Sequence, residues 1–181
     1  MRLDSPAPLS AGRLVFERPR AEDLDALAAL HADPRVMATL GGVRTRVQTQ
    51  EFLAQLLAHW EEHGFGLWVV REHSTWRFAG RGGLRRVAIG GADEVELAYA
   101  LVPELWGLGL ATEIARESVR VAFEALGLPD LVCFTLETNL ASRRVMEKAG
   151  FRYERDLVHA GAPHALYRLD AGAWRAAGAS G

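Results

Sequence analysis

Residues 95–113 read VELAYALVPELWGLGLATE, and this stretch decides the fold. From Glu94 to Val102, successive side chains alternate in a period of two, which predicts a central β-strand. A loop from Pro103 to Gly109 follows, and apolar residues at helical spacing then continue to about Leu126. Another strand signal runs over 131–136. A strand, a helix and a second strand in this order predict a parallel pair joined by a right-handed crossover.

Shorter strand and helix signals surround this crossover. Thr45 and Gln48 match a helix capping box, and Gly64 is a suitable end for that helix. The other elements are expected as strands at 13–18, 67–70 and 77–84, helices at 23–31 and 141–149, and a final hairpin of 151–160 and 165–169. The order β-α-α-β-β-β-α-β-α-β-β predicts an α+β fold. Its central sheet is mixed but mostly antiparallel, with helices on both faces.

The length and composition fit one globular domain. The chain has 181 residues, of which 49% are hydrophobic and 24% are charged. Residues 1–12 contain Pro6 and Pro8 and are predicted to form a flexible N-terminal arm. Residues 13–175 are expected to form the single domain, and the small residues 176–181 a frayed C-terminus.

Charge and hydropathy exclude several classes of function. A net charge of −2 provides no basic field for nucleic acid. No apolar run approaches the ~18 residues of a membrane span, and the N-terminus lacks a signal-peptide core. The one cysteine, Cys133, lies in an apolar run and is expected to be a buried structural thiol. We therefore expect a cytoplasmic protein that contacts neither nucleic acid nor membrane.

The loop before the central helix is a candidate anion site. Helix N-termini carry unpaired N–H groups and partial positive charge, and Gly107 and Gly109 would let a phosphate approach them. A plain glycine-rich loop is the alternative. No Walker A lysine follows the glycines. A dinucleotide fingerprint would need glycine where Thr112 stands, so a nicotinamide-dependent enzyme is a poorer match that stays open.

Two blocks of sequence resemble GNAT-superfamily N-acetyltransferases. Residues 95–113 are similar to the cofactor motif of the branch that acetylates ribosomal-protein N-termini, the RimJ/RimL type. Gly109 and Ala111 fit the last fixed positions of the family core, and Trp106 replaces its leading Gln or Arg. Residues 139–151 are similar to the family's N-x-x-S-x-x-x-x-E-K-x-G-F element. The resemblance covers about residues 13–169.

The resemblance implies that acetyl-CoA is the co-substrate. Its pantetheine arm would pair with the central strand where that strand splays from 131–136, and its pyrophosphate would lie over the glycine loop. A backbone N–H near Leu101 or Val102 would polarise the acetyl carbonyl. The implied cofactor positions are Ala100, Leu101, Val102, Trp106, Gly107, Leu108, Gly109, Leu110, Ala111, Thr112 and Asn139. Many members carry a polar residue at the position of Leu108, so weaker cofactor binding is expected.

Two residues are candidates for the chemistry implied by the resemblance. Glu96 is the candidate base for the attacking amine, and the alternative is a solvated or salt-bridged glutamate. Ser142 is the candidate acid for the leaving thiolate, and the alternative is an ordinary serine in a first helical turn. At pH 7, a neutral α-amine costs only about 1 kcal/mol and a neutral lysine amine about 4–5 kcal/mol. Deprotonation is therefore easiest for an α-amine.

The acceptor stays open between a protein N-terminus, an antibiotic amine and a small metabolite. A catalytically silent acyl-CoA-binding GNAT domain is the main alternative to an active enzyme. His59 and His63 are spaced i, i+4 on one helix, but a solvated pair is expected there, and no metal is predicted. Homodimers are common in the RimJ/RimL branch, so a homodimer is possible.

Overall fold

A mixed sheet organises the protein, whose computed structural model describes residues 9–178. Within this range the sheet has eight strands in the order β1-β2-β3-β4-β5-β6-β8-β7. The strands are β1 (Leu9–Ala11), β2 (Leu14–Glu17), β3 (Leu67–Glu72), β4 (Phe78–Ile89), β5 (Ala92–Leu101), β6 (Asp130–Leu136), β7 (Arg152–His159) and β8 (Ala162–Asp170). Among the strand pairs of these described residues, only β5–β6 is parallel. The predicted α+β class and the parallel crossover are confirmed.

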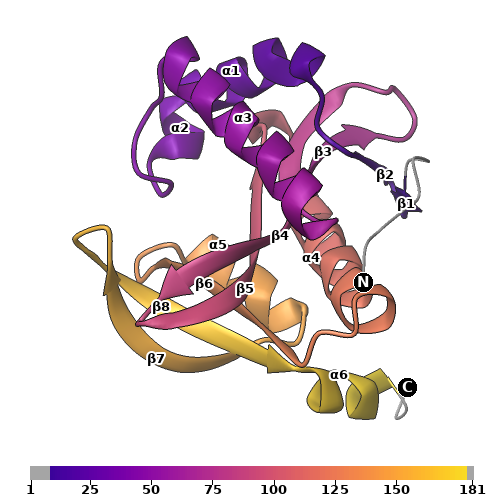
Figure 1. The fold of residues 1–181 in the computed structure, drawn as a ribbon, viewed down its shortest axis with the longest axis vertical. Helices are drawn as coiled ribbons and strands as arrows, with labels where there is room; N and C mark the ends of the chain where they lie inside the picture. Colours follow the sequence, from indigo (N-terminus) through magenta and orange to yellow (C-terminus); the bar gives the residue numbers. More distant parts are fainter. Residues whose placement is uncertain (1–8, 179–181) are drawn as a thin grey trace.

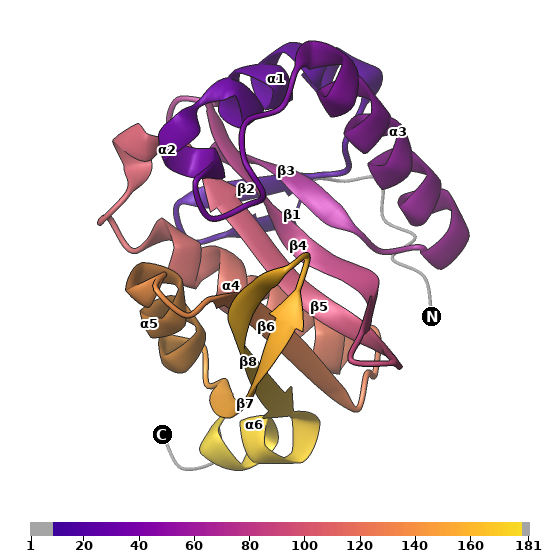
Figure 2. The same cartoon turned by 90° about the vertical axis from the view of Figure 1, so that its left-hand side faces the viewer.

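Helices cover both faces of the sheet. They are α1 (Leu24–Ala32), α2 (Pro34–Met37), α3 (Arg46–His63), α4 (Leu110–Arg120), α5 (Leu140–Lys148) and α6 (Ala171–Gly178). Neighbouring residues of β4 show the two layers: Arg81 lies against Phe52 of α3, whereas a Cβ on Gly82 would meet Ile114 of α4. Helices α1–α3 gather at one end of the molecule and α6 lies at the other (Figures 1 and 2).

Local sequence signals explain the ends of the main helices. Helix α3 begins at the predicted capping box, in which Thr45 and Gln48 each bond the other's backbone N–H, and it ends at Gly64 with φ 71°. Asn139 caps α5, because its Oδ1 accepts from the Ser142 N–H at 3.2 Å. These caps fix where both helices start relative to the strands.

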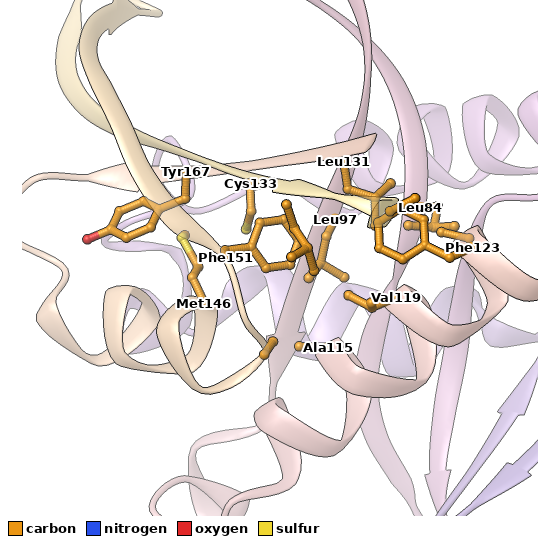
Figure 3. Packing of buried hydrophobic residues seen from close by; sticks show 14 of the residues in the cluster. Leu84, Leu97, Ala115, Val119, Phe123, Leu131, Cys133, Met146, Phe151 and Tyr167 are labelled. Carbon is orange, nitrogen blue, oxygen red and sulfur yellow. The ribbon is translucent and has the colours of Figure 1, made fainter. Parts of the chain in front are cut away.

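The larger core lies between α4, α5 and the second half of the sheet. Leu97, Cys133, Val119 and Met146 belong to this cluster and come from a different element each (Figure 3). The Cys133 side chain is only 2% exposed, and burial raises the pKa of its thiol. The prediction of a buried structural cysteine is confirmed. No helix of residues 9–178 is long and apolar enough to cross a membrane.

Two predicted ends were wrong. Leu9–Ala11 form β1 and pair with β2, because Gly12 at φ 59° reverses the chain, so the arm does not extend to residue 12. At the other end, residues 176–178 belong to α6. Asp170 Oδ1 caps this helix by accepting from the Gly172 and Ala173 N–H groups. Residues 1–8 and 179–181 lie outside the described residues.

Two helical features also escaped prediction. The short α2 begins at Pro34, where Asp33 caps it by accepting from the Arg35 N–H at 2.8 Å. The helix expected to run evenly to Leu126 changes to a π-helical turn over Val121–Ala125. Neither feature alters the hydrophobic period by much, so the period of the sequence does not reveal them.

Candidate acetyl-transfer site

The two parallel strands separate at the centre of the sheet. Strands β5 and β6 form one bridge, Glu96 with Val132, and no further pair beyond it. The Val102 N–H donates to the Ala79 carbonyl of β4 at 2.9 Å. Because backbone groups alternate in direction along a strand, the N–H groups of Tyr99 and Leu101 point instead into the gap toward β6. The splay expected from the resemblance is present.

This direction corrects one expectation. The Val102 N–H is already bonded within the sheet, so it is not available to polarise a carbonyl. The Leu101 N–H has no strand partner on its side, while the Leu101 carbonyl accepts from Trp106 Nε1 at 2.9 Å. The Trp106 indole therefore occupies the carbonyl at the end of β5, and the Leu101 N–H is left as a donor that faces the gap.

The glycine loop forms a nest of N–H groups before α4. Gly107 and Gly109 adopt φ of 77° and 83°, a region that disfavours other residues. Gly109 is the N-cap of α4 and supplies no side-chain cap. Within the described residues, no protein acceptor pairs with the N–H groups of 107–111. Consecutive free N–H groups at a helix N-terminus suit a phosphate.

Arg13 fixes this loop from the side. Its Nη2 donates to the Leu108 carbonyl at 2.7 Å, and its Nε donates to Glu113 Oε1 at 2.8 Å. The Leu108 side chain is 52% exposed and lines no part of the main cavity. Residue 108 therefore supports the loop through its backbone carbonyl, which Arg13 bonds, and the Leu108 side chain does not cover the nest.

One cavity of about 950 Å³ joins the nest to the splayed strands. Its wall includes these predicted cofactor positions: Ala100, Leu101, Trp106, Gly107, Gly109, Leu110, Ala111, Thr112 and Asn139. Val102 and Leu108 are absent from the wall. Both predicted chemical residues, Glu96 and Ser142, line the same cavity. Glu96 is on one face of β5, and Ser142 of α5 lies against the other face. The fold therefore brings residues far apart in sequence to one space.

Ser142 shares its hydroxyl with a tyrosine that sequence reasoning missed. The Tyr99 hydroxyl lies 2.8 Å from Ser142 Oγ, and burial raises the pKa of Tyr99 well above its usual value. Tyr99 also lines the cavity. Its signal in the sequence was a phenol among the aliphatic residues of one strand face. Ser142 is indeed in a first helical turn, but its hydroxyl is part of this polar pair.

Glu96 lies on the other face of β5, paired with its cross-strand neighbour. Arg85 Nε donates to Glu96 Oε2 at 2.7 Å, and the glutamate side chain is 5% exposed. The alternative of a salt-bridged glutamate is therefore correct as a description. The Glu96 Oε1 atom has no hydrogen-bond partner among residues 9–178. Every fully buried side-chain oxygen in that range has a partner, so Oε1 is not fully buried and faces the cavity that Glu96 lines.

Arg81 is a second group that the sequence did not reveal. It is 6% exposed and lines the cavity on the same face as Glu96. Its Nε donates to His31 Nε2 at 3.3 Å, and His31 Nδ1 lies 3.2 Å from Thr49 Oγ1. Burial and the charges of Arg81 and Arg44 lower the pKa of His31 to about 3. The histidine is therefore a neutral acceptor that orients the guanidinium.

This histidine makes stability depend on pH. Between about pH 6.5 and 3, His31 is protonated in the unfolded chain and neutral in the fold, so stability falls as the pH falls. The limit of this slope is about 1.4 kcal/mol per pH unit. His31→Gln should flatten the decline in unfolding free energy from pH 7 to 5, measured with urea. The exposed control His73→Gln should keep it. Equal slopes in both variants would contradict the assignment.

The histidines expected as a solvated pair are partly bonded. His59 Nδ1 lies 2.9 Å from the Phe65 carbonyl, and its Nε2 accepts from the Arg86 N–H at 3.0 Å. Both nitrogens are therefore occupied, and burial lowers the pKa of His59. In the part of the chain that the structure describes, no group of three or more His, Cys, Asp or Glu residues could hold a metal ion.

Several known proteins are similar to this chain in sequence and in fold. The chain is 29% identical to the uncharacterized protein YkkB of Bacillus subtilis over 161 residues, covering 86% of this chain and 94% of YkkB. It is 26% identical to YoaA of Bacillus subtilis, described as an uncharacterized N-acetyltransferase, over 81% of this chain and 83% of YoaA. The crystal structure of the acetyltransferase from Agrobacterium tumefaciens strain C58 superposes with a TM-score of 0.79 at 26% identity, covering 91% and 95% of the two chains.

The family profile described as "Acetyltransferase (GNAT) domain" matches residues 13–152. This range contains the splayed strands, the N–H nest, Glu96 and the Tyr99–Ser142 pair. Members of the family use acetyl-CoA as the acetyl donor. The chain therefore belongs to the GNAT family of acetyltransferases and is an acyltransferase enzyme of the N-acetyltransferase type.

Proposed function

We propose that this enzyme transfers the acetyl group of acetyl-CoA to a primary amine in a ternary complex. One observation carries the proposal: a single cavity contains the N–H nest, the open edge of β5 and a carboxylate. The nest suits a pyrophosphate, the open edge suits an amide-containing arm, and the carboxylate suits an amine.

The donor is held by backbone groups and two cationic side chains. The pyrophosphate takes the N–H groups of 107–111, and the pantetheine amides pair with the free backbone of Tyr99, which leaves the Leu101 N–H for the acetyl carbonyl. Arg144 and Lys148 of α5 line the same cavity and supply positive charge to the phosphates. Asn139 contributes less to the donor than first expected, because its Nδ2 donates to Thr135 and its Oδ1 caps α5.

Transfer begins with attack of the neutral amine on the thioester carbonyl. Glu96 accepts the amine proton at Oε1, directly or through one water, and Arg85 holds the other carboxylate oxygen in place. The Leu101 N–H donates to the carbonyl oxygen as negative charge develops there. Holding both substrates in one cavity supplies the proximity that a direct attack needs.

The departing thiolate requires a proton donor, and the Tyr99–Ser142 pair provides one. The two hydroxyl oxygens lie 2.8 Å apart and either can donate to the other, so Ser142 can pass its proton to sulfur while the phenol donates to Ser142 Oγ. Ser142→Ala should lower kcat about 10- to 100-fold, and Tyr99→Phe less, since general-acid steps contribute about 10²–10⁴-fold. Both kcat values come from CoA release at saturating substrates.

A matched control is available on helix α4. Ser118 is buried and bonds the Ile114 carbonyl, away from the cavity, so Ser118→Ala should leave kcat near that of the parent enzyme. If Tyr99→Phe lowers kcat far more than Ser142→Ala, the tyrosine itself is the donor. If neither variant changes kcat, water protonates the thiolate and the assignment is wrong.

Three finer assignments complete the proposal. The motif at 95–113 supports the RimJ/RimL-like branch, which acts on protein N-terminal amines, and a small-molecule amine is the alternative acceptor. A homodimer and a cytoplasmic location are further expectations. Size-exclusion chromatography with light scattering tests the dimer directly, and a monomer at micromolar concentration would reject it.

Thermal unfolding with acetyl-CoA, CoA or NADH tests the proposed activity. A ligand at 100 times its Kd adds about 2.7 kcal/mol, which raises Tm by roughly 5–10 °C in a chain of this size. We expect that shift with acetyl-CoA and CoA but not with NADH, together with CoA release when amines are added. A shift without turnover of any amine would indicate a silent acyl-CoA-binding domain. A shift with NADH alone would indicate a nicotinamide enzyme.

A further inference from the structure

Two arginines on the acceptor side of β5 have no carboxylate partner in the part of the chain that the structure describes. Arg81 makes one side-chain bond, through Nε to His31, so its terminal nitrogens pair with no group in residues 9–178. Fully buried side-chain nitrogens in this range all have hydrogen-bond partners, so the unpaired terminal nitrogens of Arg81 are not fully buried and face the cavity that Arg81 lines. Arg44 also lines the cavity, and its guanidinium lies over the ring of Phe52 without an ion pair in residues 9–178.

Among residues 9–178, Arg81 is unusual because it is both buried and without an acid. Arg71, which is 22% exposed, pairs with both Glu17 and Asp23 at 2.7 Å. Arg35, on the rim of the same cavity, pairs with Asp33 at 2.6 Å. The fold thus provides acids for less buried arginines and none for Arg81. A buried arginine without an acid costs stability, which is expected where the missing anion comes from a ligand.

Both unpaired charges are held against the same aromatic ring. The guanidinium carbons of Arg44 and Arg81 lie 4.8 Å and 5.0 Å from the centre of the Phe52 ring. Neutral His31, itself held by Thr49, fixes the fork of Arg81. Burial and repulsion from Arg85 and Arg44 lower the pKa of Arg81 to about 9, so it stays charged at neutral pH. A bound anion would relieve that repulsion.

The local charges favour an acceptor with both signs. On this face the cavity contains Arg44, Arg81 and Arg85, opposed by the single carboxylate of Glu96. Cross-strand pairing places Arg81 opposite Ala100 and Arg85 opposite Glu96. The cationic end of the site therefore lies beside the open end of β5, and the carboxylate lies farther along the strand. An acceptor bearing only positive charges would be repelled here.

We propose that the acceptor is a small amine that carries a carboxylate, bound by the guanidinium groups of Arg81 and Arg44 while its amine lies toward Glu96. Arg recognises carboxylates through two parallel hydrogen bonds, which is the geometry that a fixed fork provides. This assignment rests on the proposed acetyl transfer and specifies its substrate class. Polyamines and aminoglycosides, which lack an anion, are poor acceptors of this enzyme.

The test compares acceptors that differ only in the carboxylate. The full-length enzyme is supplied with acetyl-CoA and with L-amino acids, their carboxamides, ω-amino acids of increasing length, spermidine and a peptide with an acidic second residue. We expect the amino acids or ω-amino acids to be acetylated with kcat/KM at least about 10-fold above that of their carboxamides or of spermidine, the loss typical of one charged hydrogen bond.

Variants assign the effect to the arginines. Arg44→Gln and Arg81→Gln should each raise KM for the carboxylate acceptor about 10- to 100-fold and leave KM for its carboxamide unchanged. Arg35→Gln, a cavity arginine with its own acid, is the matched control and should change neither value. Arg81→Lys should restore charge but not the fork, with an intermediate KM. Because Arg81→Gln could unfold, the partly exposed Arg44 provides the independent variant, and the Tm shift with acetyl-CoA verifies folding.

The outcomes separate this inference from the proposed activity. If no amine is acetylated and acetyl-CoA gives no Tm shift, the proposed activity fails, and the acceptor inference with it. If carboxamides or spermidine are acetylated as well as the amino acids, or if Arg44→Gln is neutral, the acetyltransferase stands and the inference is overturned. If only the acidic peptide is acetylated, the acceptor is a protein N-terminus and the small-molecule assignment is wrong.

Discussion

Glu96→Gln is expected to lower kcat/KM for the acceptor about 100- to 1,000-fold, within the range of a lost general base. The amide still accepts from Arg85 Nε, so the 2.7 Å contact survives while the proton-accepting oxygen is lost. The KM for acetyl-CoA should remain within about twofold, because the nest at 107–111 lies on another element. Steady-state kinetics with acetyl-CoA and the acceptor varied in turn measure both quantities.

The neighbouring acid of the same strand is the control for this variant. Glu94 is also partly buried and bonds an arginine, Arg168, at 2.8 Å, but it does not line the cavity. Glu94→Gln should therefore lose stability without losing kcat/KM. If Glu96→Gln keeps full activity at pH 7 and its rate merely follows the fraction of neutral amine, no enzyme base is needed. Glu96 would then serve only to neutralise Arg85.

Removing the Glu96 carboxylate, which lines the cavity together with three arginines, is also expected to change the stability of the fold. Without the Glu96 carboxylate, Arg81 would still be repelled by Arg85 and Arg44, and no other acid of residues 9–178 lines the cavity to oppose them. We therefore expect Glu96→Gln to have a lower Tm than the parent enzyme and to recover part of it when a carboxylate acceptor is added. Kinetic comparison should be made below the Tm of the variant, so that unfolding is not counted as lost catalysis.

The central crossover could be predicted because its signals are local. The alternation before Val102, the glycines at 107 and 109 and the helical period after them each depend on a few neighbouring residues. The same holds for the caps at Thr45 and Asn139. Of the predicted cofactor positions, all but Val102 and Leu108 line the cavity, and their role in binding stays a prediction.

The missed residues depend on tertiary contacts. Arg81 is one of many arginines in the sequence, and only the packing of α1 and α3 against β4 leaves it buried and without an acid. Tyr99 reads as one more apolar residue until α5 brings Ser142 within 2.8 Å of its hydroxyl. The direction of the Val102 N–H follows from its bond to Ala79, a register between strands that the sequence does not encode locally.

Strand β5 divides the site into two chemical halves. Its odd-numbered side chains face α4 and α5, where Tyr99 meets Ser142, and its even-numbered side chains face α1–α3, where Glu96 meets Arg85. Since the strand separates from β6 after Leu97, one cavity reaches both halves. In the proposed mechanism the amine gives its proton to Glu96 on one side and the thiolate takes a different proton from Ser142 on the other, so a single strand separates the base from the acid.

The nest before α4 provides the second large effect. Gly107→Ala is expected to raise KM for acetyl-CoA at least about 10-fold and to abolish most of the Tm shift with CoA, since a phosphate must approach these N–H groups to about 2.9 Å. A Cβ at Gly107 meets no protein atom within 4 Å, so the methyl group occupies open space beside the nest rather than disturbing the core. Titration of Tm with CoA and the KM for acetyl-CoA are the measurements.

A glycine in a distant turn isolates the cofactor effect from backbone strain. Gly91 has φ 84° against 77° for Gly107, and its Cβ would likewise meet nothing within 4 Å. Alanine at either position costs about 1–2 kcal/mol of folding stability for the left-handed conformation, so the two variants should lose similar Tm without ligand. Only Gly107→Ala should then lose the response to CoA. Equal responses in both variants would mean that the pyrophosphate binds elsewhere, and the nest would be a plain glycine-rich turn.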